Sequence, residues 1–330
     1  MQKSAHPTYR YHPDWGYWFR PELNVRFPQD CERRLPAYRL RTNGVGGPSS
    51  HELSSESEGK VKALFIGCSF TVGDGVGQHE NFVSQLERLR PGIIGHNYAL
   101  NGSGNCQQLL IHNHFAPLIE PDLFVLSPYT GCVKRTVIRE RPTYDPLKNC
   151  KVGRPKPFFL LDEKDRLHLG NSPVPKVSEQ YSAEAGPAPI HFEIDSDKAP
   201  EIAAAAESKR FHAPPPIEEP KTPSYEIYSH PDQLHYRIVK KVLMATILFS
   251  KAKRKIIMPL PHVNNLLHPE EEYRHLYEEV AFETGCEFHD VTPDFAPFRE
   301  EKFESLFLGG DGHYSKRGHE VVARSLSCIL

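Results

Sequence analysis

The stretch GCSFTVGDGV, residues 67–76, decides how the rest of the chain is organised. It follows an apolar run at residues 61–66, and that pattern predicts a buried strand. Glycines crowd residues 73–77, and apolar residues then recur at helical spacing over residues 82–89. The predicted order is therefore strand, tight turn and helix, and Ser69 lies in the turn.

Ser69 is the candidate nucleophile of this turn. Open α/β sheets bind their ligands at the carboxyl ends of their strands, which is where this side chain is expected. The backbone N–H of Ser69 also lies near the start of a helix, a position that favours developing negative charge. The alternative is a serine that only forms a turn or caps the helix.

Strands and helices alternate along most of the chain. Further strands are predicted at residues 93–100, 123–126, 255–260 and 286–291. Helices are predicted at residues 102–115, 234–251 and 270–284, and a last helix follows Ser315 as its N-cap. This alternation predicts an α/β fold, with a parallel sheet that is covered by helices on both faces.

The composition limits the classes of partner and compartment. The chain has 330 residues and a formal net charge of −2, which gives no reason to expect nucleic acid or an acidic membrane surface as partner. Its first residues contain no apolar leader, and no run approaches the roughly 20 apolar residues that span a bilayer. Seven cysteines without an export signal are typical of free thiols in a reducing compartment, so we expect a cytoplasmic protein.

Three parts of the chain differ in character. Residues 1–59 form an aromatic-rich arm, expected to pack on the core or, alternatively, to offer an aromatic shelf to a substrate. Residues 60–135 and 231–330 carry the α/β alternation and form the expected core. Residues 136–230 are an expected insertion, with a hairpin at residues 158–169 and then a polar segment rich in proline and alanine. Long irregular insertions of this kind are typical of lids and binding loops.

A base for Ser69 is expected near the end of the chain. The segment GGDGHYSKRGH contains Asp311, His313 and His319. In extended backbone, residues two apart point to the same side, so Asp311 is able to orient the ring of His313. His313 would then take the proton of Ser69, whereas His319 falls inside the predicted helix and is interpreted as structural. A surface loop with an incidental Asp and His is the alternative.

Donors for an oxyanion are expected in NYALNGSGN, residues 97–105. Gly102 lies between the predicted strand and helix, where its N–H is able to face the same cleft as Ser69. Gly104 and Asn105 are the next candidates. Turn glycines that serve only the backbone are the alternative.

These three blocks resemble, in their order and in their position near strand ends, those of the SGNH/GDSL hydrolase family. GCSFTVGDG resembles the family's first block, NYALNG its second, and DGHYSKRGHEVVA its last block in the subtype with Asp and His two residues apart. The resemblance implies Ser69 as nucleophile, Asp311 and His313 as its partners, and the N–H groups of Ser69 and Gly102 as oxyanion donors. It also implies a three-layer α/β/α sandwich with a parallel sheet of about five strands.

The chain departs from the family pattern at two positions. Cys68 stands where the first block usually has Asp. After the third strand the family offers an Asn side chain as an oxyanion donor, whereas this chain has Cys132 near that position, and a thiol is a weak donor. One alternative is that Asn101, Asn105 or a backbone N–H replaces the missing amide. The others are that the enzyme turns over slowly, or that the protein is not a hydrolase.

Lys134 and Arg135 follow the third predicted strand. They are able to contact an anionic group of a substrate, and a solvated basic patch is the alternative. The cysteine spacings match no zinc motif, so we expect no metal, and no cofactor is expected either.

The leading hypothesis is a serine esterase that hydrolyses an acyl, chiefly acetyl, ester of a carbohydrate-like or natural-product substrate through an acyl-enzyme. The expected partner is thus a small-molecule or glycan ester, and the oligomeric state stays open. A second hypothesis is an acyltransferase that uses the same residues to acylate a sugar or another hydroxyl. A third is a non-catalytic binding protein on a degenerate hydrolase fold.

Overall fold

The computed structural model describes residues 8–27, 29, 36–54, 59–145, 150–175, 227–267, 273–298, 305–309 and 312–330. Of the sequence-based expectations, Asp311 and most of the proline- and alanine-rich segment fall outside these ranges. The same holds for the start of the helix predicted at residues 270–284.

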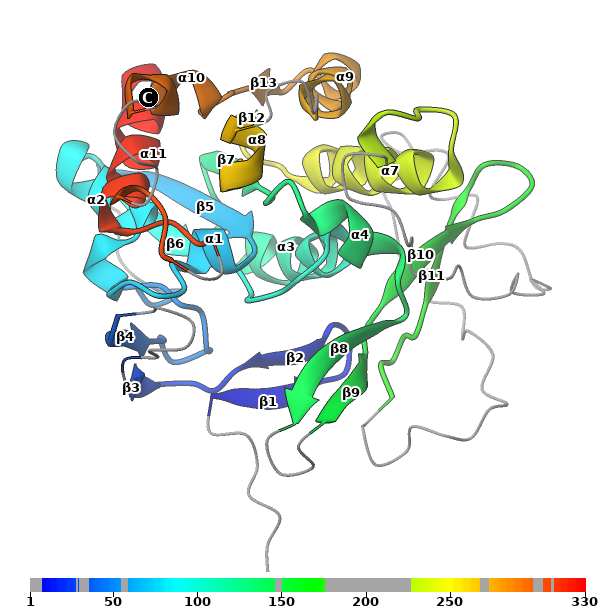
Figure 1. Cartoon of the computed structure of the whole chain (residues 1–330), viewed down its shortest axis with the longest axis horizontal. Coiled ribbons are helices and arrows are strands. Elements are labelled where there is room, and N and C mark those ends of the chain that lie inside the picture. Colours follow the sequence, from blue (N-terminus) through cyan, green and yellow to red (C-terminus); the bar gives the residue numbers. More distant parts are fainter. Residues whose placement is uncertain are drawn as a thin grey trace, which may run out of the picture.

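A five-stranded parallel sheet forms the centre of the molecule (Figure 1). Its order is β13-β12-β7-β5-β6, and every neighbouring pair is parallel. The strands are β5 Val61–Gly67, β6 Ile93–Asn97, β7 Leu123–Ser127, β12 Arg254–Ile257 and β13 Glu287–Phe288. The predicted sheet is confirmed, but three strands are shorter than predicted: β6 ends at Asn97, β12 ends at Ile257, and β13 has only two residues.

Alternate residues of the strands enter two separate hydrophobic clusters, one on each face of the sheet. Leu64 and Ile66 of β5 pack with side chains of α3, α7 and α9, whereas Ala63 and Phe65 pack with side chains of α2 and α11. This is the period of two that a strand buried on both faces must show. The predicted three-layer arrangement is therefore confirmed (Figure 1).

The helices that cover the sheet and support its loops are of very different lengths. They are α1 Ser69–Val72, α2 Phe82–Leu89, α3 Asn105–Ile119, α4 Cys132–Val137, α7 Leu234–Phe249, α8 Val263–Leu267, α9 Arg274–Thr284, α10 Thr292–Phe295 and α11 Lys316–Ile329, with 3-10 turns η1 Gln78–Glu80 and η4 Ala296–Phe298. The helix predicted at residues 102–115 begins three residues later, because Gly102 adopts a left-handed conformation. Leu89 is largely exposed, so α2 buries Phe82, Val83 and Leu86 instead.

The described residues of the N-terminal arm form two antiparallel hairpins. They are formed by β1 Tyr9–His12 with β2 Gly16–Phe19, and by β3 Asn24–Phe27 with β4 Tyr38–Arg41. Trp18 is buried and its ring stacks on Phe115 of α3, with ring centroids 5.4 Å apart. Aromatic burial of this kind fixes the arm to the helix layer.

The described part of the predicted insertion contains two hairpins. The hairpin predicted at residues 158–169 is present as β10 Phe158–Leu161 and β11 Leu167–Gly170. A further hairpin, β8 Glu140–Asp145 with β9 Cys150–Pro155, was not predicted. In Figure 1 its strands run beside the β1–β2 hairpin of the arm.

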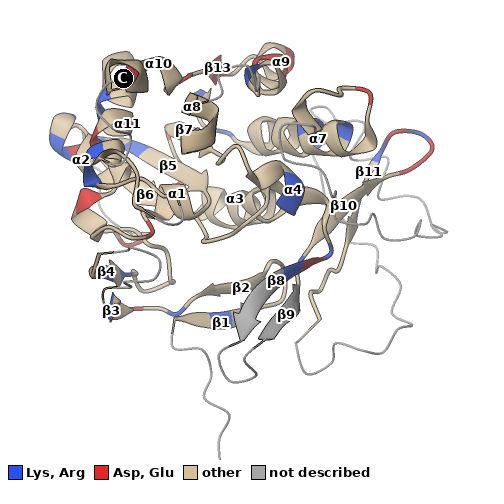
Figure 2. Cartoon of the chain, in the orientation of Figure 1, with Lys and Arg blue, Asp and Glu red and all other residues tan. Residues whose placement is uncertain are grey.

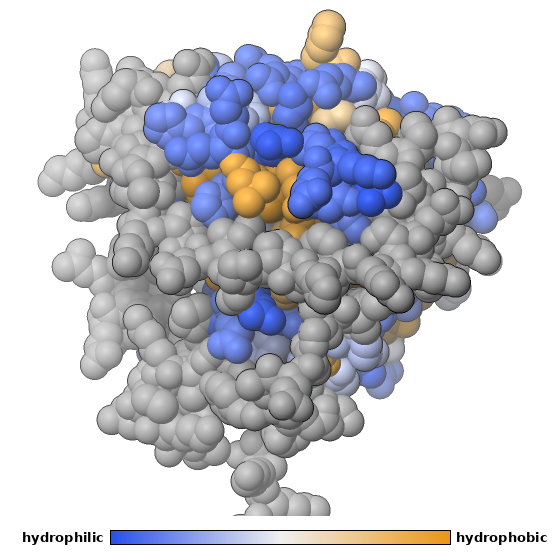
Figure 3. All heavy atoms as spheres, turned by 90° about the vertical axis from the view of Figure 1, so that its right-hand side faces the viewer, coloured by the Kyte–Doolittle hydropathy of each residue, from blue (hydrophilic) through white to orange (hydrophobic). Residues whose placement is uncertain are grey.

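The surface on the side of α7 and the β10–β11 hairpin is largely hydrophilic where the structure describes it. Figure 3 shows a hydrophobic area there that is framed by hydrophilic residues. Within the described ranges, no helix combines the length and the apolar character that crossing a bilayer requires.

Candidate active site

Ser69 begins α1 just after the interior strand β5, which lies between β7 and β6. The strand delivers it to the carboxyl edge of the sheet, and only Cys68 separates the two elements. Ser69 is 6% exposed, so its hydroxyl lies in a sheltered position rather than on an open surface. Among the described residues, no acceptor is found for its backbone N–H, as expected for the first residue of a helix.

His313, from near the end of the chain, contacts the side chain of Ser69. Its Nε2 lies 2.8 Å from the Ser69 Oγ, although the two residues are 244 positions apart in sequence. This is the hydrogen-bonding distance that a nucleophile and its general base require. The structure therefore brings these two predicted site residues together.

The loop that carries His313 is fixed on both sides. The Leu308 N–H donates to the His313 carbonyl at 2.6 Å. The next residue, Tyr314, is fully buried and its hydroxyl donates to the Pro261 carbonyl at 2.8 Å. Ser315 then caps α11, as predicted, by accepting the Gly318 N–H. These contacts hold the imidazole in place before any substrate arrives.

Gly312 marks a sharp bend directly before the histidine. Its φ is +73°, a left-handed conformation that favours glycine, and the ring of His262 occupies the space where a β-carbon would lie. The expected orienting carboxylate, Asp311, lies outside the described residues. Its role stays a prediction from the sequence.

The loop after β6 brings Gly102 toward the candidate nucleophile. The Leu100 N–H and the Ser103 hydroxyl both donate to the Gly67 carbonyl, each at 3.1 Å. Gly67 is the last residue of β5, so these bonds tie the loop to the strand that presents Ser69. Gly102 has a φ of +69°, and no described group accepts its N–H. It remains available as an oxyanion donor.

The other candidate donors are occupied within the fold. The Asn105 amide donates to Gln108 at 3.0 Å, and its oxygen accepts the Thr136 hydroxyl at 2.8 Å. The Gly104 N–H donates to the Gln107 side chain at 3.2 Å. Cys132 is fully buried, with its sulfur 3.4 Å from the Ser103 carbonyl. The structure therefore aims neither the Asn105 amide nor the Cys132 thiol at the hydroxyl of Ser69.

Asn101 retains an unused side-chain oxygen. Its Oδ1 is buried and has no hydrogen-bond partner among the described residues. Its backbone carbonyl accepts the Tyr17 hydroxyl at 2.6 Å, so the N-terminal arm reaches the loop that carries Gly102. The arm thus contacts the loop of the candidate site, and its role as an aromatic shelf for a substrate stays a prediction.

Cys68 and Cys132 lie together beneath the candidate nucleophile. Burial acts to raise the pKa of the Cys68 thiol, but a hydrogen bond from Cys132 and the positive charge of Arg135 lower it overall. Burial and the neighbouring Cys68 raise the pKa of Cys132. Cys106, the third cysteine near a strand end, lies instead against Lys156. No group of three or more His, Cys, Asp or Glu side chains in the described part of the chain is placed to hold a metal ion.

His319 has the structural position that the sequence indicated. It is 1% exposed, and its Nδ1 accepts the Phe82 N–H at 3.2 Å. Burial, with a smaller contribution from His313, lowers the pKa of His319 to about 3. The ring is therefore neutral at physiological pH and joins α11 to α2.

Two residues near the site were not identified from the sequence. Tyr129 stacks on Phe70, the neighbour of Ser69, with ring centroids 4.5 Å apart. Arg141 of β8 donates from Nη1 to the Tyr17 hydroxyl at 3.2 Å and to the Asn101 carbonyl at 3.3 Å. Neither carries a local sequence pattern, because each reaches the site only through tertiary contacts.

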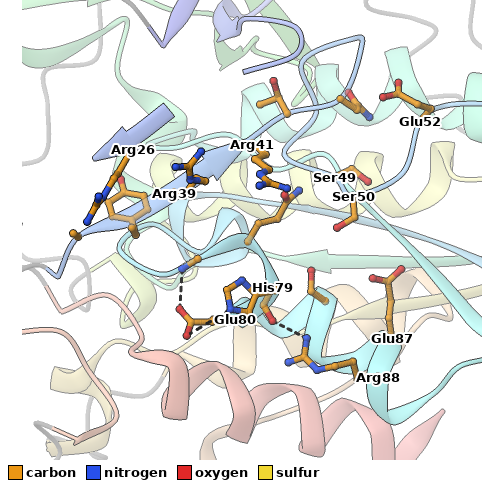
Figure 4. A pocket seen from close by; sticks show the side chains of 17 residues that line it. Arg26, Arg39, Arg41, Ser49, Ser50, Glu52, His79, Glu80, Glu87 and Arg88 are labelled. Carbon is orange, nitrogen blue, oxygen red and sulfur yellow. Dashed lines mark hydrogen bonds and ion pairs between the residues drawn. The ribbon is translucent and has the colours of Figure 1, made fainter. Parts of the chain in front are cut away.

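A cavity of about 990 Å³ lies apart from these residues, between the β3–β4 hairpin and the η1–α2 segment (Figure 4). Arginines of the hairpin face acidic and basic side chains of η1 and α2 across it. Arg88 donates to the His79 carbonyl, and Glu80 accepts the Gly77 N–H. Neither Ser69 nor His313 lines this cavity, so it is not part of the candidate active site.

Comparison with known proteins finds similarity in the fold of the chain. No protein-family model matches the chain, and neither does any curated protein. Axe2, an acetylxylan esterase from Geobacillus stearothermophilus, aligns over 82% of this chain and 94% of its own, with 14% identity and a TM-score of 0.45. A member of the lipolytic G-D-S-L family from Veillonella parvula aligns over 82% and 97%, with 13% identity and a TM-score of 0.44. LAE5, an α/β hydrolase from the metagenome of Lake Arreo, aligns over 81% and 94%, with 12% identity and a TM-score of 0.45.

The chain is thus structurally similar to esterases of the SGNH/GDSL type at low sequence identity. Likeness at these scores carries no argument about chemistry. What this chain does must be argued from its own side chains.

Proposed function

We propose that the protein is a serine hydrolase that cleaves a carboxylic ester. The observation that carries this proposal is the hydrogen bond between the Ser69 Oγ and the His313 Nε2 at 2.8 Å. Turn serines are common, but a sheltered one at the end of an interior strand, bonded to an imidazole from a distant loop, has the geometry of an activated nucleophile.

In the proposed reaction, His313 takes the hydroxyl proton as the Ser69 Oγ attacks the ester carbonyl. The N–H groups of Ser69 and Gly102 donate to the oxyanion that forms. His313 then protonates the departing alcohol, which leaves an acyl group on Ser69. Water, deprotonated by His313, releases the acid. Asp311 is assigned the part of orienting the imidazole, on the strength of the sequence alone.

The proposed substrate is an acyl ester, chiefly an acetyl ester, of a carbohydrate-like or natural-product alcohol. This choice rests on the resemblance of the sequence blocks to the SGNH/GDSL family. The reaction type rests on the geometry of the two side chains, so the two parts of the proposal stand separately.

Acyl transfer to an alcohol is the second candidate function. It is favoured by the contact of β8 with the Gly102 loop through Arg141, because a segment that covers a site is able to exclude water. Addition of an acceptor alcohol to the assay separates the two reactions. A transferase forms the new ester faster than the free acid, and a hydrolase forms mainly the acid.

The test compares p-nitrophenyl acetate turnover by the wild type and by Ser69→Ala, with Ser327→Ala of α11 as the control serine variant. We expect a loss of at least about 10³-fold for Ser69→Ala and no loss for the control. A fluorophosphonate probe should label Ser69, as shown by peptide mapping. Equal turnover by all three proteins would instead favour a binding protein without catalysis at this site. A label on another residue would overturn the assignment of Ser69 as nucleophile.

A further inference from the structure

Three cationic side chains gather around the loop that carries Gly102. Arg141 of β8 contacts the Asn101 carbonyl, and Arg135 of α4 lies with its Cζ 5.6 Å from the centre of the Tyr129 ring. Lys156 follows β9 and is 1% exposed. Figure 2 shows basic positions in α4 and, next to an acidic position, at the start of β8.

The positive charges of both arginines act on Lys156. Burial is the main reason that the pKa of Lys156 is lowered; Cys106 acts to raise it, and Arg141 and Arg135 lower it further. Among the described residues, Lys156 Nζ forms hydrogen bonds with the Cys106 sulfur, at 3.4 Å, and the Pro157 carbonyl, at 2.9 Å. Like charges that converge in a sheltered place repel unless an anion lies between them.

No carboxylate in the described part of the chain balances this cluster. Neither arginine nor Lys156 forms an ion pair with a described Asp or Glu. The Arg135 Nη1 is buried and has no hydrogen-bond partner there. Burial acts to lower the pKa of Arg135, but the neighbouring Cys132 and Cys68 raise it overall. A buried guanidinium nitrogen without a hydrogen-bond partner is still costly, and planar guanidinium groups suit the paired oxygens of a carboxylate or a phosphate.

The cluster lies beside the candidate nucleophile. Arg135 covers Tyr129, Tyr129 stacks on Phe70, and Phe70 follows Ser69 in α1. Arg141 packs directly on Gly102, the proposed oxyanion donor. A substrate held at Ser69 would thus have its oxyanion side near the two guanidinium groups. The exposed Lys60, by contrast, precedes β5 at the opposite edge of the sheet.

We propose that Arg135 and Arg141, with Lys156 behind them, bind an anionic group of the substrate, so that the ester carries a carboxylate or a phosphate. This inference rests on the proposed function, since it names the substrate class of the same site. It assigns a specificity role to Arg135, which the sequence offered as a possible anion contact, and to Arg141, which the sequence did not suggest.

Matched pairs of esters test the proposal. On the acyl side, 4-nitrophenyl hemisuccinate is compared with neutral 4-nitrophenyl butanoate. On the alcohol side, 3-acetoxybenzoate and 3-acetoxyphenyl phosphate are compared with neutral phenyl acetate, which also separates carboxylate from phosphate. We expect the wild type to favour one charged ester over its neutral partner by at least about tenfold in kcat/KM.

The variants Arg141→Gln and Arg135→Gln should each lower kcat/KM for that charged ester by about 10- to 100-fold. Turnover of the neutral partner should stay within about threefold, and Lys60→Gln should leave both rates unchanged. Equal losses for charged and neutral esters would overturn the proposal, because they would mean that the guanidinium groups serve the oxyanion itself. A wild type without preference for any charged ester would overturn it as well.

Binding by Ser69→Ala separates this proposal from the proposed function. Calorimetric titration with succinate and with inorganic phosphate needs no turnover, and we expect at least one to bind and to lose affinity in Arg141→Gln. Anion binding without serine-dependent turnover would refute the esterase and retain the anion site. Serine-dependent turnover without anion binding would retain the esterase and refute the anion site. If Arg135→Gln is poorly folded, Arg135→Lys takes its place in the test. This variant keeps the charge and should retain part of the affinity for the anion.

Discussion

The Nη1 of Arg141 occupies the point at which a β-carbon on Gly102 would lie. Gly102 also has a φ of +69°, in the region that side chains rarely adopt. Two independent constraints, one of backbone conformation and one of space, therefore require glycine beside the candidate nucleophile. The second of them exists only because β8 reaches this loop.

Gly102→Ala should therefore lower activity as well as stability. The left-handed conformation alone costs a β-carbon about 1 kcal/mol. The methyl group would in addition clash with Arg141 and turn the Gly102 N–H away from the oxyanion, so we expect kcat to fall by at least about tenfold. Gly285→Ala is the control, because Gly285 has the same φ of +69° with nothing within 4 Å of a β-carbon. The control should lose about 1 kcal/mol in urea denaturation and no activity, and equal activity losses in both variants would contradict this account.

His313 and His319 allow the catalytic and structural roles of the last segment to be separated. His313→Gln removes the proposed base, so ester turnover should fall by about 10²- to 10⁴-fold while the unfolding midpoint stays near that of the wild type. His319→Gln removes a buried ring that accepts the Phe82 N–H, and should cost about 1–3 kcal/mol of stability with kcat within about threefold. Steady-state kinetics and urea denaturation of both variants measure this contrast. The opposite pattern would transfer the base to His319.

The sheet and the meeting of Ser69 with His313 could be predicted because both depend on local patterns. An apolar run such as residues 61–66 is buried on both faces, so its pattern survives folding. Ser69 and His313 each adjoin such an element, and the carboxyl ends of parallel strands share one edge. The contact follows from the topology without knowledge of any intervening loop.

The contributions of Tyr17 and Arg141 could not be predicted in the same way. Tyr17 belongs to β2 of the arm, Arg141 to β8 of the insertion, and they meet only over the Asn101 carbonyl. The start of α3 was misplaced for a related reason. Hydrogen bonds from Leu100 and Ser103 to Gly67 hold the loop open until Asn105, and such long-range bonds leave no periodic pattern in the sequence.

Restoring the amide that the family resemblance leads one to expect should not improve the enzyme. The Cys132 sulfur is fully buried and lies against the Ser103 carbonyl, so an Asn at this position would place a larger polar group where no water reaches. We expect Cys132→Asn to lose about 1–3 kcal/mol of stability, with no gain in kcat beyond about threefold. Cys328→Asn, at an exposed cysteine, should leave both unchanged. A tenfold gain in kcat for Cys132→Asn would show that this position is the vacant oxyanion donor.

Buried histidines should make the protein sensitive to mild acid. Burial lowers the pKa of His112 and of His96 to about 4, and that of His319 to about 3. These values lie below the ordinary pKa of 6.5. Between the two pKa values the three histidines are therefore protonated in the unfolded chain and neutral in the folded chain. The stabilising contribution is therefore complete above about pH 6.5 and is lost as the pH falls toward 4.

The free energy of unfolding should change with pH by at most about 1.4 kcal/mol per pH unit for each fully buried histidine. We expect the free energy of unfolding in urea to fall between pH 6.5 and pH 5, and His112→Gln, which removes one of the three rings, to show a shallower fall. His79→Gln is the matched control, because the side chain of His79 is 80% exposed, and it should retain the wild-type slope. A wild type whose unfolding free energy is flat over this interval would mean that these rings accept protons in the folded state.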